Sequence, residues 1–162
     1  MRRVQGAGAC AGVSLAALAS ILGAQDLSAL EKEISGTWRL LRTEQTLVDG
    51  STRPNPVYGP HPVGYVIYDP THHMCLFLTR SQIGAEEPAP SGNGLNSYCG
   101  RWSIDPTSMT MFHETEMDIL PKRAGIVRMP KFKFKDGNLY LYPPIDTQGV
   151  VSYALIFEKV RG

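Results

Sequence analysis

The sequence lacks the short motifs that identify common nucleotide-dependent and nucleophilic enzymes. It contains no glycine-rich phosphate loop, no dinucleotide-binding fingerprint and no Asn-x-Ser/Thr acceptor for glycosylation. No serine lies in a nucleophile elbow. His72 and His73 are adjacent in an expected turn, where neighbouring side chains diverge, and no familiar ligand spacing surrounds them. We therefore expect neither a metal site nor a cofactor.

The chain also lacks a large excess of charge of either sign, because its 16 basic and 15 acidic side chains give a net charge of +1. Two of the basic side chains lie at the N-terminus. Arg2 and Arg3 precede an uncharged run, Val4 to Gln25, which is rich in Ala and Leu and ends in small residues. This pattern predicts a secretory signal peptide over residues 1–24. A retained membrane anchor is the alternative, because about 20 uncharged residues can just span a bilayer.

Cleavage would leave 14 of the 16 basic side chains and all 15 acidic ones, a net charge near −1. Such a chain has no bulk attraction for nucleic acid or for an anionic membrane. We predict a protein that is secreted or lies within the secretory pathway, with no stable membrane insertion after cleavage.

Cysteine is scarce, with three in the chain, and cleavage would leave only Cys75 and Cys99. An oxidising compartment permits a disulfide between them. If their strands pair simply, with Arg80 beside Tyr98, the two cysteines lie about four residues apart along the sheet, roughly 13 Å. We therefore expect two buried thiols.

After the signal, residues 25–35 are expected to form a short helix. Leu27, Leu30 and Ile34 are spaced as on one helical face, and Ser28 with Glu31 fits a capping box.

From residue 36 onward the hydrophobic pattern has a period of two and is broken by turn residues. Eight runs follow in order: TWRLLRTEQTLV, GYVIYD, HMCLFLTR, YCGRWSID, SMTMFHETEM, GIVRMPKFKFK, NLYLY and VVSYALIFEKV. Eight strands with short connections predict one all-β domain over residues 36–162, an up-and-down barrel able to enclose a small ligand. The two long loops, residues 49–62 and 81–96, are either a lid over the barrel mouth or plain surface loops.

The stretch MPKFKFKDGNLYLYPP shows the pattern most clearly. Successive strand side chains point to opposite faces, so Phe132 and Phe134 face inward while the alternating lysines face water. Asp136-Gly137 between two such runs predicts a tight hairpin turn. A nucleic-acid strip is rejected because the lysines and phenylalanines lie on opposite faces.

The same parity assigns other interior positions. The sixth run places inside Ile126, Arg128, Phe132 and Phe134. The fifth places inside Met109, Met111, His113 and Thr115, with Thr110, Glu114 and Glu116 outside. The last places inside Val151, Tyr153, Leu155 and Phe157. In HMCLFLTR, periodicity does not choose between the set with Met74 and Arg80 and the set with Cys75 and Phe77.

This interior predicts a small-molecule site with apolar walls and a few polar groups. The expected walls are Phe132, Phe134, Met111, Leu141 and Tyr153. Arg80, Arg128 and His113 are expected to orient an oxygen-bearing group of the ligand. For each polar residue taken singly, the alternative is structural: an arginine paired with a carboxylate such as Glu44, or a hydrogen-bonded core histidine.

The segments GTWRLLRTEQTLVDG, YGPHPVGYVIYDPTHHMCLFLTR, YCGRWSID, KDGNLYLYPP and LIFEKV, in this order, resemble the lipocalin-like domain family. The resemblance implies a small barrel with Trp38 across its closed end and a basic residue of the last strand, Lys159 or Arg161, beside it. It also implies that Met74 and Arg80 lie on the functional side of their strand.

The resemblance does not supply a catalytic set, because similar barrels include carriers of hydrophobic molecules as well as cyclases and isomerases. Our main hypothesis is binding of a small hydrophobic, oxygen-bearing molecule. The alternative is a cofactor-independent cyclase or isomerase acting on a polyketide or terpenoid intermediate of secondary metabolism. There His113 or Tyr153 would move a proton, and Arg80 or Arg128 would stabilise an enolate-like oxygen. An unpaired His113 facing a cavity would favour the enzyme, and a barrel without a cavity would favour a purely structural protein. The oligomeric state is not predicted.

Overall fold

The structure is a computed structural model that describes residues 27–81, 94–145 and 147–161. The expected signal peptide, residues 1–24, and most of the second long loop lie outside these residues. Residues 27–34 are helical, within the range expected for the short helix. The strands and one 3₁₀ helix, η1, follow as β1 Gly36–Leu47, β2 Thr52–Arg53, β3 Pro62–Tyr68, β4 His73–Arg80, β5 Leu95–Asp105, β6 Thr110–Asp118, η1 Pro121–Arg123, β7 Val127–Arg128, β8 Lys131–Lys135, β9 Asn138–Tyr142 and β10 Val150–Lys159.

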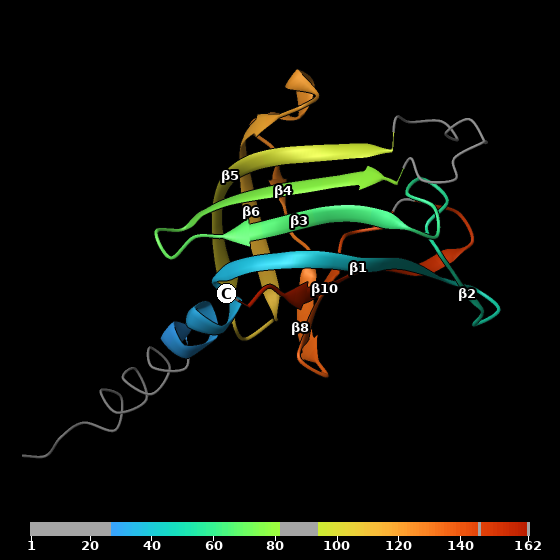
Figure 1. Cartoon of the computed structure of the whole chain (residues 1–162), viewed down its shortest axis with the longest axis horizontal. Coiled ribbons are helices and arrows are strands. Elements are labelled where there is room, and N and C mark those ends of the chain that lie inside the picture. The colour runs from blue at the N-terminus through green and yellow to red at the C-terminus, as the bar shows by residue number, and fades with distance from the viewer. Residues whose placement is uncertain (1–26, 82–93, 146, 162) are drawn as a thin grey trace, which may run out of the picture.

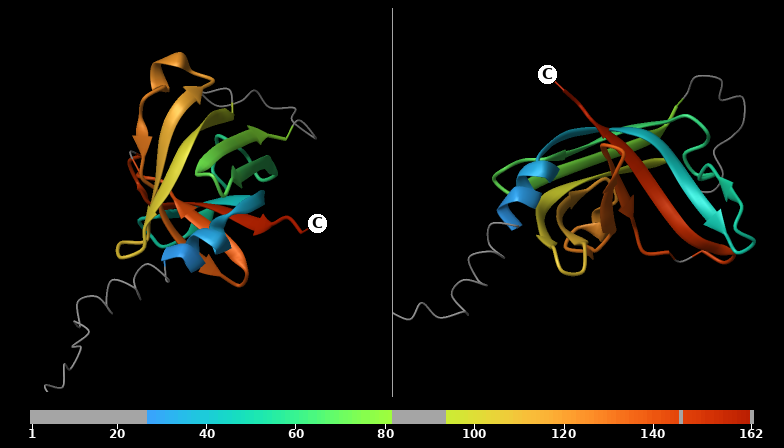
Figure 2. Two further views of the ribbon diagram at one scale, coloured as in Figure 1. Left: turned by 90° about the vertical axis from the view of Figure 1, so that its left-hand side faces the viewer. Right: turned by 90° about the horizontal axis from the view of Figure 1, so that it is seen from below.

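The strands form a closed antiparallel barrel, as expected (Figure 1). Its eight members pair in the order β1, β3, β4, β5, β6, β8, β9 and β10, and β10 pairs again with β1. The turned views in Figure 2 show the sheet wrapping around on itself, with the segment between β6 and β7 projecting from it. Within the described part of the chain, no helix is long and apolar enough to cross a membrane.

The hairpin at Asp136-Gly137 is confirmed. Lys131 to Lys135 pair with Asn138 to Tyr142, and both turn residues have positive φ, 53° and 77°. A tight turn with this backbone matches the twist of the strands that it joins. Phe132 is buried in the core and the three lysines are exposed.

The run expected as one sixth strand is divided. β7 pairs with β6 at His113 and Glu114, whereas β8 pairs with β6 only at Thr110. Pro130 lies at the break, where its missing N–H prevents a continuous ladder. Ile126, expected inside, is 45% exposed at the projecting end of this segment.

The other parity assignments hold in the middle of the strands and fail near their ends. Met74, Leu76 and Leu78 are buried, so the face left open in β4 is settled in favour of the set containing Met74. Met111, His113 and Thr115 are buried as expected, but so is Thr110, whose hydroxyl lies 2.6 Å from Lys131 Nζ. In β10, Leu155 and Phe157 join the core, while Val151 is 57% exposed because it lies at the barrel rim.

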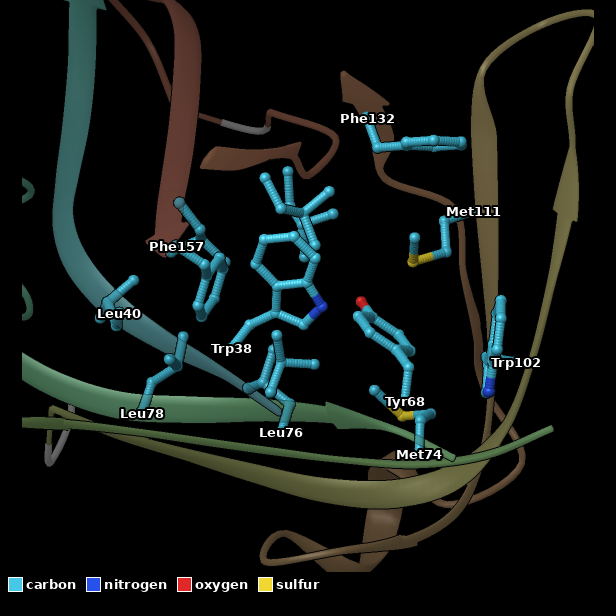
Figure 3. Close-up of a cluster of buried hydrophobic side chains, with 14 of the residues drawn as sticks. Trp38, Leu40, Tyr68, Met74, Leu76, Leu78, Trp102, Met111, Phe132 and Phe157 are labelled. Atoms are coloured by element: carbon cyan, nitrogen blue, oxygen red, sulfur yellow. The ribbon is translucent and has the colours of Figure 1, made fainter. Parts of the chain in front are cut away.

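One end of the barrel is filled by aromatic side chains (Figure 3). Trp38 is buried, its Nε1 donates to Ile34 O at 2.7 Å, and its ring lies 5.9 Å from the ring of Phe134. Lys159 Nζ lies 5.1 Å from the centroid of the indole and donates to Glu33 O. Lys159, rather than Arg161, is thus the basic residue beside Trp38, and this contact ties the helical segment to the last strand.

The expectation of two free thiols is wrong. Cys75 and Cys99 form a disulfide, with their Cα atoms 4.1 Å apart. They are direct partners in the ladder because β5 begins at Leu95, opposite Thr79, rather than at Tyr98 opposite Arg80. The assumed register was shifted by about four residues, since the sequence does not reveal where the long loop ends and β5 begins.

Gly100 allows β5 and β6 to approach closely at a β-bulge next to the disulfide. A Cβ on this residue would lie 1.9 Å from Glu114 O and 2.8 Å from Glu116 N, both rigid backbone atoms. We expect Gly100→Ala to lower the free energy of unfolding by about 2 kcal/mol, because the strands must separate to admit the methyl group. Urea unfolding measures this, with the exposed Ser103→Ala on the same strand as a control that stays within about 0.5 kcal/mol of the wild type. Equal stability of the two variants would contradict the close approach.

Candidate functional site: a cavity beside a tyrosine-histidine-tyrosine network

The barrel contains a cavity of about 350 Å³ whose lining does not include Trp38. Its apolar walls are Leu76, Leu78, Val127, Met129, Pro130, Leu141, Pro143, Pro144 and Leu155. Its polar lining consists of Tyr58, Asn96, Tyr98, His113, Arg128 and Tyr153. A volume of this size suits one small molecule, and apolar walls with a few convergent polar groups are typical of ligand sites.

The first long loop contributes directly to this cavity. Tyr58 is buried at its edge, and the loop is held by hydrogen bonds from Val57 N to Asn55 Oδ1 and from Asn55 N to Thr43 Oγ1. A short strand, β2, pairs with the end of β1 within the same loop. The loop thus covers part of the barrel mouth.

Four of the residues expected in the site line the cavity: His113, Arg128, Leu141 and Tyr153. Phe132, Phe134 and Met111 do not, and are corrected here to core positions packed toward Trp38 and Trp102 (Figure 3). Parity correctly placed them inside, but it does not tell how far along the barrel axis a residue lies. A charged residue at position 132 would therefore probe the stability of the core rather than ligand binding.

Arg80 is also corrected, because it does not line the cavity. It ends β4 opposite Pro62, where its guanidinium packs beside Gly59 and its backbone N donates to Gly94 O. One of its nitrogens, Nη1, is buried without a hydrogen-bond partner among the described residues. Tyr58, the residue before Gly59, lines the cavity, whereas Arg80 does not.

His113 is held between two tyrosines. Its Nε2 lies 3.0 Å from the hydroxyl of Tyr68, and its Nδ1 lies 2.9 Å from the hydroxyl of Tyr98. Burial, together with the charge of Arg128, lowers the pKa of His113 to about 3, so the ring is neutral at physiological pH. Burial raises the pKa of Tyr68 and Tyr98, and both remain protonated. The network is therefore uncharged.

Arg128 carries the charge nearest to this network, and that charge is compensated. Its Nη2 lies 2.7 Å from the carboxylate of Asp118, whose side chain is almost fully buried, and Nη1 donates to the Thr115 hydroxyl. The guanidinium also lies 4.1 Å from the centroid of the Tyr98 ring. The partner expected for an inward arginine, Glu44, instead lies 3.6 Å from Arg42.

Tyr153 differs from the other cavity tyrosines because its hydroxyl is buried and makes no well-aligned hydrogen bond with a described residue. Burial and the neighbouring Tyr58 raise its pKa, the Asn55 side chain lowers it by less, and the hydroxyl is therefore protonated. It is therefore a donor that remains available to a molecule in the cavity.

Sequence reasoning missed Tyr98, Tyr68 and Asp118. Period-two alternation in YCGRWSID puts Tyr98 on the same side as Trp102, so the signal for an inward tyrosine was present. The contact of Tyr98 with His113 could not be predicted from the sequence, because it depends on the bulge between β5 and β6. Asp118, at the end of β6, gave no sequence signal for burial.

The site contains no candidate metal centre. Across residues 27–81, 94–145 and 147–161, no three His, Cys, Asp or Glu side chains gather closely enough to hold a metal ion.

Comparison with known proteins agrees with the resemblance seen in the strand motifs. No curated protein matches the chain. The family model for a lipocalin-like domain matches residues 35–159, from the residue before β1 to the last residue of β10. The match covers most of the chain and the whole barrel, and the protein therefore belongs to the lipocalin-like domain family.

Proposed function

We propose that the protein binds one small, hydrophobic, oxygen-bearing molecule in the barrel cavity. The observation that carries this proposal is the cavity of about 350 Å³ with apolar walls and buried hydroxyl groups at its surface. The cavity also argues against a filled, purely structural barrel. The family fold agrees with ligand binding in general, and the nature of the ligand is inferred from the lining alone.

The alternative, a cofactor-independent cyclase or isomerase, finds less support. It calls for a group able to move a proton, and both ring nitrogens of His113 are already hydrogen-bonded. Tyr153 is the better candidate for that role because its buried hydroxyl has no well-aligned partner among the described residues. With its pKa raised by burial, Tyr153 would act as a proton donor rather than as a base.

We also propose that the protein works outside the reducing cytosol. The Cys75–Cys99 disulfide supports this location, since such bonds persist mainly in oxidising compartments. The pattern of the first 24 residues supports it independently.

Blocking the cavity mouth tests the binding function. Met129 lines the cavity and is 51% exposed, so Met129→Trp should fill the mouth without disturbing the core. The purified protein is incubated with a small-molecule extract of its source, and bound and free compounds are analysed by mass spectrometry. We expect the wild type to retain an unchanged compound at about one per chain, as a cavity sized for one ligand requires. We expect Met129→Trp to lose this compound.

Val63→Trp is the matched control, because Val63 is 48% exposed and lies outside the cavity lining. It should bind as the wild type does. Equal retention by both tryptophan variants would place binding elsewhere. A compound that disappears while another of equal or water-shifted mass accumulates beyond the protein concentration would mean turnover, and the cyclase would replace the carrier.

A further inference from the structure

The distances around His113 do not by themselves show which group donates and which accepts in each of its two hydrogen bonds. A neutral imidazole has one N–H donor and one acceptor nitrogen. Both nitrogens face a tyrosine hydroxyl, so one tyrosine donates to the ring and the other accepts from it. Two arrangements satisfy the ring equally well, and they differ in which tyrosine keeps a hydroxyl hydrogen to donate elsewhere.

The surroundings of Tyr68 select between them. Tyr68 is fully buried and absent from the cavity lining, and Figure 3 shows its ring among apolar side chains of the core. Its hydroxyl makes no hydrogen bond other than the one to His113 in the part of the chain that the structure describes. If Tyr68 only accepted, its own hydrogen would be buried without a partner, which is costly. Tyr68 therefore donates to Nε2, and the proton of the ring lies on Nδ1.

Tyr98 then accepts from Nδ1–H, and its hydroxyl hydrogen is left without an acceptor in the network. Unlike Tyr68, Tyr98 lines the cavity. A fixed donor thus faces the space in which a ligand would lie, and Tyr153 offers a second buried hydroxyl at the same cavity.

The charge balance restricts the acceptor that fits. Arg128 is compensated by Asp118 and Thr115, and His113 is neutral. An anionic ligand would bring a buried charge with no unpaired cation among the described lining residues, which is unfavourable. An uncharged oxygen acceptor needs only the hydroxyl donors.

We propose that Tyr98, oriented by Tyr68 through His113, donates a hydrogen bond to a carbonyl oxygen of an uncharged, mostly apolar ligand. This inference rests on the proposed function, because it assumes that the cavity holds the ligand. The sequence analysis expects Arg80, Arg128 and His113 to orient the ligand oxygen, and this inference assigns that role to Tyr98 instead. His113 is a positioning residue that does not itself touch the ligand oxygen.

The first test uses prodan, a fluorescent naphthyl ketone, and its parent dimethylaminonaphthalene, which lacks the carbonyl. We expect Tyr98→Phe to weaken binding of prodan about fivefold, as the loss of one neutral hydrogen bond implies, and to shift its bound emission to the blue. Binding of the parent compound should not change. Tyr140→Phe, which removes a tyrosine hydroxyl outside the cavity lining, should affect neither probe.

The second test needs no variant and no ligand. Long-range ¹H–¹⁵N NMR of the wild-type protein should show the His113 proton on Nδ1. A proton on Nε2 would overturn the assignment of Tyr98 as the donor, as would an equal loss of both probes in Tyr98→Phe. A naphthalene carboxylate that bound more tightly than prodan would overturn the choice of a neutral ligand. If neither prodan nor its parent bound to the wild type, the proposed function itself would fail, and with it this inference, whatever the NMR result.

Discussion

Acidification from pH 7 to pH 4 is expected to lower the free energy of unfolding by about 3 kcal/mol through His113 alone. The folded pKa of His113 is about 3, whereas the ordinary value is 6.5. Below pH 6.5 the unfolded chain takes up a proton that the folded protein excludes, so the unfolded state is favoured increasingly as the pH falls. The loss continues until about pH 3, where the folded ring is protonated as well.

Two features of the site cause this sensitivity. The ring of His113 is fully buried, and Arg128 adds a positive charge nearby. An imidazolium would also have to donate from both nitrogens, so Tyr68 could no longer donate to Nε2. Protonation would therefore break the network as well as bury a charge.

Urea unfolding at several pH values, on the wild type and His113→Gln, measures the effect. The variant lacks the titrating ring, so its stability should fall about 3 kcal/mol less than that of the wild type over the same pH range. His61→Gln replaces an exposed histidine and should keep the full wild-type loss. Parallel curves for the wild type and His113→Gln would show that burial of His113 does not govern acid stability.

Alternation of side chains was enough to predict the barrel and much of its interior. It worked in the middle of β6, β8 and β10, where one face is buried and a shift by one residue would expose every apolar side chain. It failed at Ile126 and Val151, since strand ends at the rim lose their cover while the alternation continues. The period-two pattern shows which face of the sheet a side chain lies on, but it does not show whether other residues cover that side chain.

The register between neighbouring strands could not be predicted from the sequence, and this led to the errors for the cysteines and for several site residues. The expected register excludes the disulfide because it starts β5 at Tyr98, whereas β5 begins at Leu95, and the residues of the long loop give no signal for where that strand begins. Phe132 and Phe134 were placed in the site for the same reason, because height along the barrel depends on the stagger of neighbouring strands. His113, Arg128 and Tyr153 were found because polar residues at inward positions are conspicuous wherever they lie.

Reduction of the Cys75–Cys99 disulfide is expected to lower the free energy of unfolding by about 3.5 kcal/mol. The two cysteines are 24 residues apart in the chain, and closing a loop of about this length restricts the unfolded chain by that amount in the chain-entropy description. The bond also links β4 to β5 next to the bulge at Gly100. Because a long connection between the two strands does not constrain how they align, the bond fixes the register of their pairing. Urea unfolding with and without a phosphine reductant measures the difference.

The double variant Cys75→Ser/Cys99→Ser separates this bond from other effects of the reductant. It cannot form the bond, so the response of the wild type to the reductant should vanish in this variant. The variant should match the reduced wild type in stability, because both lack the same constraint on the unfolded chain. A wild type that unfolds at the same urea concentration with and without reductant would mean that strand pairing alone fixes the register of β4 and β5.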